Sequence, residues 1–293
     1  MRNMNIAIMT DSNSGITQAQ GKELGIYVVP MPFYIDGELY FEDVNLTREE
    51  FFARQAAGAD ISTSMPSPGD LLDQWKTLLK EYDQIIYIPM SSALSSSCAT
   101  SLAMAEDEFP GRVFVVDNQR ISVTQRESVL AAKAMAENGM SGAEIRNRLL
   151  ETKSDSSIYI AVDTLTYLKK GGRITPAAAA VGTLLRIKPV LQIQGGKLDA
   201  FAKCRTVKHA RTTMLEAISD DLENRFHISK DSSEAVFAAS HTMNDEDAAA
   251  WLEEIRQAFP GREIHMDPLS LSIACHIGPG SSAVTVGRKI PTE

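Results

Sequence analysis

The sequence predicts an α/β protein with two α/β domains, and three observations lead to this fold class. Short apolar runs alternate with amphipathic segments, as expected when strands and helices alternate along a chain. The 293 residues are enough for two domains of roughly 100–200 residues each. In the second half, two strand-like runs meet at a Gly-Gly pair, which is typical of a hairpin. We therefore expect a domain over residues 1–157 with a mainly parallel sheet, and a domain over residues 158–293 with a mixed sheet.

Five short runs are the first predicted strands of the chain. They are rich in Ile, Val and Tyr and almost continuously apolar. This composition favours strands that are covered on both faces, as in a parallel sheet. The runs cover residues 5–9, 25–30, 84–89, 112–117 and 157–163.

The helices between these strands begin at recognisable capping residues. Thr47 and Glu50 have the spacing of a capping box, and the same spacing recurs from Ser141. Ser67 is followed by proline, which is a favoured pair at the start of a helix. The apolar residues after it repeat at helical spacing and predict one buried face: Leu71, Leu72, Trp75, Leu78, Leu79 and Tyr82.

The second half of the chain begins with the predicted hairpin, whose two strands are joined at Gly195 and Gly196. A long helix is expected from about Thr206. After it we expect a strand, a helix and a strand at residues 234–240, 245–259 and 263–266. The last strand is expected to end in the glycine-rich segment CHIGPGSS, at residues 275–282.

The charge balance argues against nucleic acid as a partner. The net charge is −9 at pH 7, whereas binding to phosphate groups requires a basic surface. Residues 163–211, here called the basic segment, are the exception. Ten Lys or Arg against two Asp give this segment a charge of +8 and leave −17 on the remainder. We expect the basic segment to steer an anionic ligand or partner.

The cysteines and the apolar runs indicate the compartment. Cys98, Cys204 and Cys275 are widely spaced and form no CxxC pair, so they predict reduced thiols and not a zinc ribbon or a disulfide framework. The apolar run at residues 5–9 is too short for a signal peptide, and no run approaches the ~20 residues of a membrane span. We expect a soluble cytoplasmic protein with at most transient membrane contact.

Hydroxyl-rich segments follow several predicted strands. The run SSALSSS, at residues 91–97, comes after the strand at residues 84–89, and residues 62–64 precede a predicted helix start. Ligands of open α/β sheets bind beyond the carboxyl ends of the strands. Hydroxyls beside helix N-termini favour an anion, and Arg173 and Arg205 would add charge-assisted hydrogen bonds. The pattern therefore predicts an anion-binding site.

Each of these features also has a purely structural interpretation. Serine runs are common helix caps, a lone histidine such as His276 is more often structural, and residues 278–280 form a typical turn sequence. Gly171 and Gly172 before Arg173 have the form of a helix C-cap. The repetition of polar residues at strand ends is what favours a binding site.

The sequence contains no familiar motif for a nucleotide or a metal. It has no GxGxxG, no GxxxxGK[ST] and no His/Asp/Glu cluster at metal-ligand spacing, so we expect neither metal nor cofactor. A Ser–His–Asp triad of Ser95, His276 and Asp11 stays open, although no GxSxG elbow supports it.

Seven short motifs occur in order along nearly the whole chain. They are TDS at 10–12, TSMPSPG at 63–69, SSALS at 91–95, VVD at 115–117, DTLTYLKKGGRI at 163–174, IKPVL at 187–191 and HIGPG at 276–280. Together they resemble the DegV family of bacterial fatty-acid-binding proteins. The chain departs from the family pattern at Met65, Ser96, Ser97 and Asn118, where Gln, Gly, Thr and Ser are usual.

The resemblance implies a fatty acid in a tunnel between the two domains. It also implies a separate ATP-dependent fatty acid kinase that phosphorylates the bound carboxylate for use in phospholipid metabolism. By position in the motifs, Thr63 and Ser95 would hold the carboxylate. The residues that would border the head group are Ser64, Ser92, Arg173, Arg205, His276 and Gly278. The chain itself would be a lipid-binding carrier and not an enzyme.

Two classes of function follow from these observations. The first is a carrier of a long-chain fatty acid. For this class, the Ala-rich run at residues 175–187 and the methionines are suitable lining, and ordinary helix packing is the alternative for that run. The second is an acyl- or phosphoryl-group hydrolase or transferase that uses Ser95 and His276. A fatty acid that stays bound during purification would favour the carrier.

Overall fold

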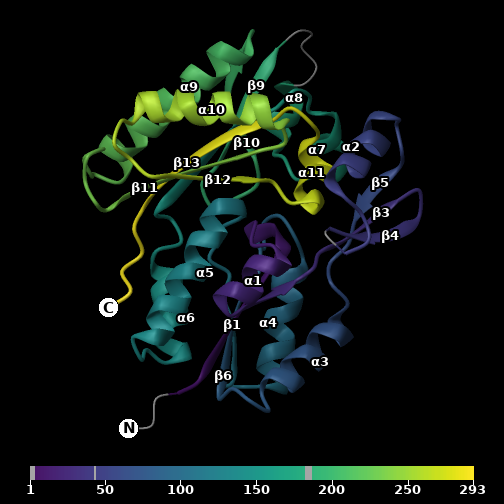
Figure 1. Ribbon diagram of the computed structural model, residues 1–293, viewed down its shortest axis with the longest axis vertical. Helices are drawn as coiled ribbons and strands as arrows, with labels where there is room; N and C mark the ends of the chain where they lie inside the picture. Colours follow the sequence, from purple (N-terminus) through teal and green to yellow (C-terminus); the bar gives the residue numbers. More distant parts are fainter. Residues whose placement is uncertain (1–3, 43, 182–186) are drawn as a thin grey trace. The chain divides into compact units, whose positions relative to one another are not determined.

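The computed structural model describes residues 4–42, 44–181 and 187–293 (Figure 1). Contacts between residues divide the chain into two compact units. The first unit is Met1–Lys153 together with Ile290–Glu293, and the second unit is Ser154–Lys289. The first strand of the second unit begins at Ser156, so the division falls a few residues before the boundary expected after residue 157.

The first unit is built around a four-stranded sheet with the order β2-β1-β6-β7. All three of its strand pairs are parallel, which confirms the predicted parallel sheet. The strands are β1 (Ile6–Asp11), β2 (Ile26–Val29), β6 (Gln84–Ile88) and β7 (Val113–Val115).

Helices cover both faces of this sheet, as the apolar strands predict. Ile8 and Met9 are neighbours on β1 but belong to different hydrophobic clusters. One cluster includes Val129 of α5, and the other includes Trp75 of α3. The helices of the first unit are α1 (Gln18–Leu24), α2 (Arg48–Ala56), α3 (Pro68–Leu78), α4 (Ser97–Glu108), α5 (Ser122–Glu137) and α6 (Gly142–Glu151), with a 3-10 turn at Ser12–Ser14.

The predicted helix caps are confirmed. Thr47 and Glu50 form a complete capping box at the start of α2, and Ser141 forms another with Glu144 at the start of α6. The Ser67 hydroxyl accepts a hydrogen bond from the backbone N–H of Asp70, which caps α3. These residues were predictable because a cap depends on only four neighbouring positions.

A second, three-stranded sheet of the first unit was not predicted. It has the order β4-β3-β5, and both of its strand pairs are antiparallel. Its strands are β3 (Pro32–Ile35), β4 (Glu38–Phe41) and β5 (Ile61–Thr63). Ser62 and Thr63 pair with Tyr34 and Phe33 of β3. These two residues therefore belong to a strand and not to a loop.

The second unit contains a mixed six-stranded sheet with the order β10-β9-β8-β13-β11-β12. The pair β11·β12 is parallel, whereas the other four pairs are antiparallel. The predicted hairpin is confirmed as β9·β10. The strands are β8 (Ser156–Ala161), β9 (Lys188–Ile193), β10 (Asp199–Cys204), β11 (Ala235–His241), β12 (Ile264–Pro268) and β13 (Ser282–Arg288).

Two expectations about the second unit were wrong. The run that forms β8 was grouped with the parallel strands, but β8 is antiparallel to both of its neighbours, β9 and β13. A strand buried on both faces has the same composition in either kind of sheet. The glycine-rich segment does not end a strand. Its first three residues, 275–277, are the end of helix α11 (Leu271–Ile277), and its last residue, Ser282, begins β13.

The helices of the second unit pack on this sheet and on one another. Helix α9 contacts β8, β9, β10 and β13, and α7 contacts α11 (Figure 1). The remaining bounds are α7 (Thr166–Gly171), α8 (Pro176–Val181), α9 (Val207–Asp220), a π-helical turn at Asp221–Arg225 and α10 (Asp245–Ala258). The Ala-rich run expected to line an acyl chain begins in α8, but residues 182–186 lie outside the described residues.

Candidate functional site

The carboxyl ends of β1 and β6 define the position of the candidate site in the first unit. The chain leaves β1 toward β2 on one side, and β6 lies on the other side of β1. Such a change of direction is where open α/β sheets bind ligands. Asp11 ends β1, and the SSALSSS run follows β6 directly.

Asp11 fixes the backbone at this point of the sheet. Its carboxylate accepts hydrogen bonds from the backbone N–H of Met90 at 2.8 Å and of Asn13 at 3.0 Å, and from the side-chain amide of Gln125 at 3.0 Å. Burial raises the pKa of Asp11 to about 6, although these hydrogen bonds oppose the shift. Within the first unit, the Asp11 carboxylate therefore holds the end of β1 against the start of the SSALSSS run and the α5 helix.

The SSALSSS run is held in place by the loop that follows β7. The backbone N–H of Ser91 donates to the carbonyl of Arg120 at 3.0 Å. The backbone N–H of Ser92 donates to Asp117 Oδ1 at 3.1 Å, and the Ser92 hydroxyl donates to Asp117 Oδ2 at 2.5 Å. Both the backbone N–H and the hydroxyl of Ser92 therefore donate to Asp117, whose carboxylate lies beside the run.

Ser95 lies at the start of α4. Its hydroxyl oxygen accepts a hydrogen bond from the backbone N–H of Ser97 at 3.2 Å. Ser96, the residue before the helix, makes no side-chain capping bond of its own, so Ser95 takes that role. A hydroxyl that accepts one hydrogen bond still has a proton to donate. Ser95 can therefore cap α4 and bind an anion at the same time.

Thr63 and Ser64 are brought toward the same part of the first unit. Thr63 is half-buried at the end of β5, and the backbone N–H of Ser64 donates to the carbonyl of Pro32 at 3.3 Å. The next residue, Met65, has its sulfur 3.9 Å from the Ser96 hydroxyl. The segment after β5 therefore lies against the start of α4, as a shared carboxylate site for Thr63 and Ser95 would require.

In the second unit, the structure brings Arg173 and His276 together. A Cβ atom built on Gly171 would lie 2.1 Å from His276 Nδ1, so the imidazole packs directly on the α-carbon of this glycine. Arg173 donates to the carbonyl of Gly171. Burial, with a smaller contribution from the Arg173 charge, lowers the pKa of His276 to about 4. His276 is therefore neutral at pH 7.

The segment after α11 is fixed by a residue that the sequence did not reveal. The Thr242 hydroxyl donates to the carbonyl of Gly278 at 2.7 Å and accepts from the backbone N–H of Ser281 at 2.9 Å. Gly278 has φ 78°, and a Cβ there would lie 2.4 Å from the Tyr167 ring. Only glycine fits this position. Thr242 directly follows β11, and a hydroxyl after a strand is the sequence pattern that could have identified it.

Arg205 occupies a different place in the second unit. It is exposed and lies between the end of β10 and Thr206, whose hydroxyl accepts from the backbone N–H of His209 and caps α9. Gly172, with φ 68°, ends α7 as the predicted C-cap. Within the second unit, Arg173, His276 and Gly278 thus form one group around α7 and α11, and Arg205 belongs to the start of α9.

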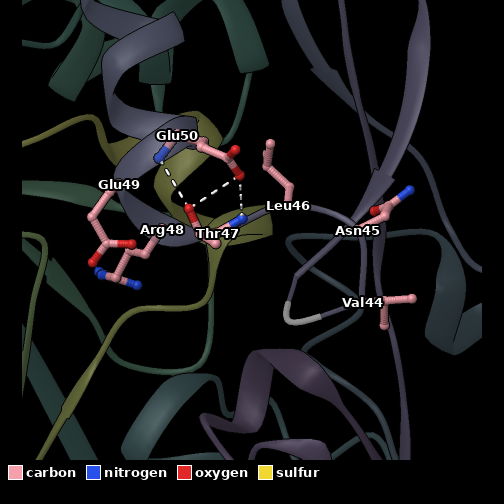
Figure 2. Close-up of a pocket in the computed structure, with 7 residues that line it drawn as sticks. All are labelled: Val44, Asn45, Leu46, Thr47, Arg48, Glu49 and Glu50. Atoms are coloured by element: carbon pink, nitrogen blue, oxygen red, sulfur yellow. Dashed lines mark hydrogen bonds between the residues drawn. The ribbon is translucent and has the colours of Figure 1, made fainter.

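Three other features of the described residues concern a metal site, a membrane span and a pocket. Within residues 4–42, 44–181 and 187–293, no group of three or more His, Cys, Asp or Glu is arranged to hold a metal ion. The same residues contain no helix long and apolar enough to cross a membrane. A pocket of about 570 Å³ at the start of α2 is lined only by residues 44–50 (Figure 2). None of the predicted site residues lines it.

Comparison with known proteins agrees with this fold. Residues 5–289 match the sequence model of an uncharacterised protein family, the DegV family. The chain is 30% identical to a DegV domain-containing protein of Deinococcus radiodurans, over 97% of this chain and 98% of the relative. It is 28% identical to protein DegV of Bacillus subtilis, over 96% and 98%. The chain belongs to the DegV family.

Two solved structures share the fold. A fatty-acid-binding DegV family protein from Thermus thermophilus has a TM-score of 0.85 and 32% identity, over 97% of this chain and 100% of that protein. DegV of Bacillus subtilis, described as a fatty acid binding protein, has a TM-score of 0.84 and 28% identity, over 98% and 100%. Fatty acid binding is thus a property of structures in this family.

Proposed function

We propose that this chain binds a long-chain fatty acid and holds its carboxylate on Thr63 and Ser95. The observation that carries the proposal is the contact between the segment after β5 and the start of α4, at the change of direction in the parallel sheet. A carboxylate removed from water must be hydrogen-bonded, and two hydroxyls beside a helix N-terminus meet that requirement without a metal.

The chain acts as a carrier in this proposal. It presents the fatty acid to a separate ATP-dependent kinase, which forms the acyl phosphate. In this proposal, Arg173, Arg205, His276 and Gly278 border the head group.

A hydrolase or transferase that uses Ser95 and His276 is the alternative. A serine nucleophile requires a base within hydrogen-bond reach. Among the described residues, the hydrogen bond of the Ser95 hydroxyl is with the backbone N–H of Ser97, which is the geometry of a cap. This structural role of the Ser95 hydroxyl supports the carrier.

A titration of the delipidated chain with a fluorescent fatty acid tests the proposal. We expect saturable binding that unlabelled hexadecanoate reverses, with one site per chain. The alternative enzyme would instead release product from an acyl or phosphoryl ester. The absence of saturable binding, together with such turnover, would contradict the carrier and favour the enzyme.

A further inference from the structure

The hydroxyl of Ser96, at the start of α4, is not used by the helix that it precedes. Ser96 is exposed and has φ −70° and ψ −11°, which is a helical conformation. A residue that caps a helix with its side chain usually has an extended conformation instead. Ser96 accordingly makes no side-chain capping bond, and the Ser95 hydroxyl accepts from the backbone N–H of Ser97. The Ser96 hydroxyl is therefore available for another partner.

The direction of this hydroxyl follows from its contact with Met65. Among the described residues, its hydrogen bond is to the Met65 sulfur, across 3.9 Å. A thioether is a weak acceptor, so this contact holds the hydroxyl proton only loosely. Met65 comes two residues after Thr63, and Ser96 directly follows Ser95. The Ser96 hydroxyl thus points from the start of α4 toward the segment after β5, and these are the two segments that carry the proposed carboxylate ligands.

We propose that Ser96 is a third ligand-binding residue, whose hydroxyl donates a hydrogen bond to the carboxylate of the bound fatty acid. This inference rests on the proposed function. On binding, the hydroxyl turns from the Met65 sulfur to a carboxylate oxygen, because an ionised acceptor forms the stronger hydrogen bond. A carboxylate has about four lone-pair sites, so it can accept from Thr63, Ser95 and Ser96 together. Ser96 is exposed, so a ligand can reach it.

Isothermal titration with hexadecanoate tests this assignment. Ser96→Ala should weaken binding about ten-fold, because one hydrogen bond to a charged acceptor is lost. Ser96→Thr keeps the hydroxyl, so its affinity should stay close to that of the wild type. Ser62→Ala is the matched control, because Ser62 is also exposed and precedes Thr63, but successive side chains of β5 point to opposite faces. Urea unfolding should give Ser96→Ala the wild-type midpoint, because the cap at Ser95 remains.

Met65→Leu separates the ligand contact from the contact within the chain. It removes the sulfur acceptor and keeps an apolar side chain of similar size, so affinity should stay close to that of the wild type. Wild-type affinity in Ser96→Ala, or a loss in Ser96→Thr or Met65→Leu as large as that in Ser96→Ala, would overturn the inference. Binding that still weakens in Ser95→Ala would then leave the proposed function intact. A wild-type chain that does not bind hexadecanoate would overturn the proposed function as well.

Discussion

The hydroxyl of Ser95 has both a structural and a functional role in this account. It caps α4 by accepting from the backbone N–H of Ser97. Under the proposed function, it would also donate to the fatty acid carboxylate. Thr63 lies at the end of β5, and under the proposed function it would contribute the second hydroxyl. The effect of a substitution at either residue on folding stability must therefore be measured separately from its effect on ligand affinity.

Thr63→Ala and Ser95→Ala should each weaken fatty acid binding roughly ten-fold or more. The reason is the loss of one hydrogen bond to a charged acceptor, which contributes ~1.5–3 kcal/mol. Isothermal titration with hexadecanoate measures the effect. Ser67→Ala is the matched control, because it removes a helix cap from α3 without removing a ligand contact. Unchanged affinity in both site variants would place the carboxylate elsewhere.

The buried carboxyl of Asp11 gives a prediction about stability and pH. Its pKa is raised from 3.8 to about 6 in the folded chain, so the folded state binds the proton more tightly than the unfolded state. Through this group, stability is present at low pH and is lost as the pH rises through about 6. From pH 7.5 to pH 5.0, the free energy of unfolding of the wild type should rise by roughly 1 kcal/mol relative to Asp11→Asn.

Urea unfolding of both proteins at the two pH values measures this difference. The comparison with Asp11→Asn removes the contribution of the other titrating groups, which both proteins share. A difference between the two proteins that stays constant with pH would show that Asp11 is ionised over the whole range.

Helices α7 and α11 are in close contact at Gly171 and His276. Gly171→Ala would place a methyl group against the His276 imidazole and should lower the free energy of unfolding by about 1–3 kcal/mol. Gly172→Ala is the matched control, because a Cβ there meets nothing within 4 Å and the cost is only that of its φ of 68°.

Chemical unfolding of four variants completes this test: Gly171→Ala, His276→Ala, the two substitutions combined, and the control Gly172→Ala. Removal of the imidazole should relieve the clash, so the combined variant should lose less than the sum of the two single losses. Additive losses would indicate that Gly171 and His276 do not touch.

The elements also show which parts of the fold a sequence can predict. The caps at Thr47, Ser67 and Ser141 and the parallel strands depend on neighbouring residues, and they were predicted correctly. Helix α11 was missed because six of its seven residues are buried, so it has no amphipathic period. The β3–β5 sheet was missed because its strands are only three or four residues long and β5 pairs with a distant segment.

The candidate site divides in the same way. Hydroxyls after strands could be identified from the sequence, since their position along the chain is the signal. Thr242 directly follows β11 and carries the same signal. Its hydrogen bond to the carbonyl of Gly278 could not be predicted, because that contact depends on which loops the tertiary structure brings together.

At the scale of the whole molecule, the basic segment is the feature that suggests a partner. Arg173→Ala and Arg205→Ala should still bind fatty acid but support phosphorylation by the cognate kinase poorly. Lys208→Ala, an exposed residue of α9, is the control. The wild-type rate should fall as salt rises, because exposed charges are screened within ~10 Å at 0.1 M ionic strength. If both arginine variants supported phosphorylation at the wild-type rate, the basic segment would be only a solvated surface with no role in recognising a partner.

The central claim is that this chain carries a fatty acid, and native mass spectrometry of the freshly purified protein tests it most directly. We expect a peak shifted by the mass of one long-chain fatty acid, which collisional activation removes, and a smaller bound fraction in Thr63→Ala. Detection of the wild-type chain only at its own mass, both before and after incubation with hexadecanoate, would contradict this claim.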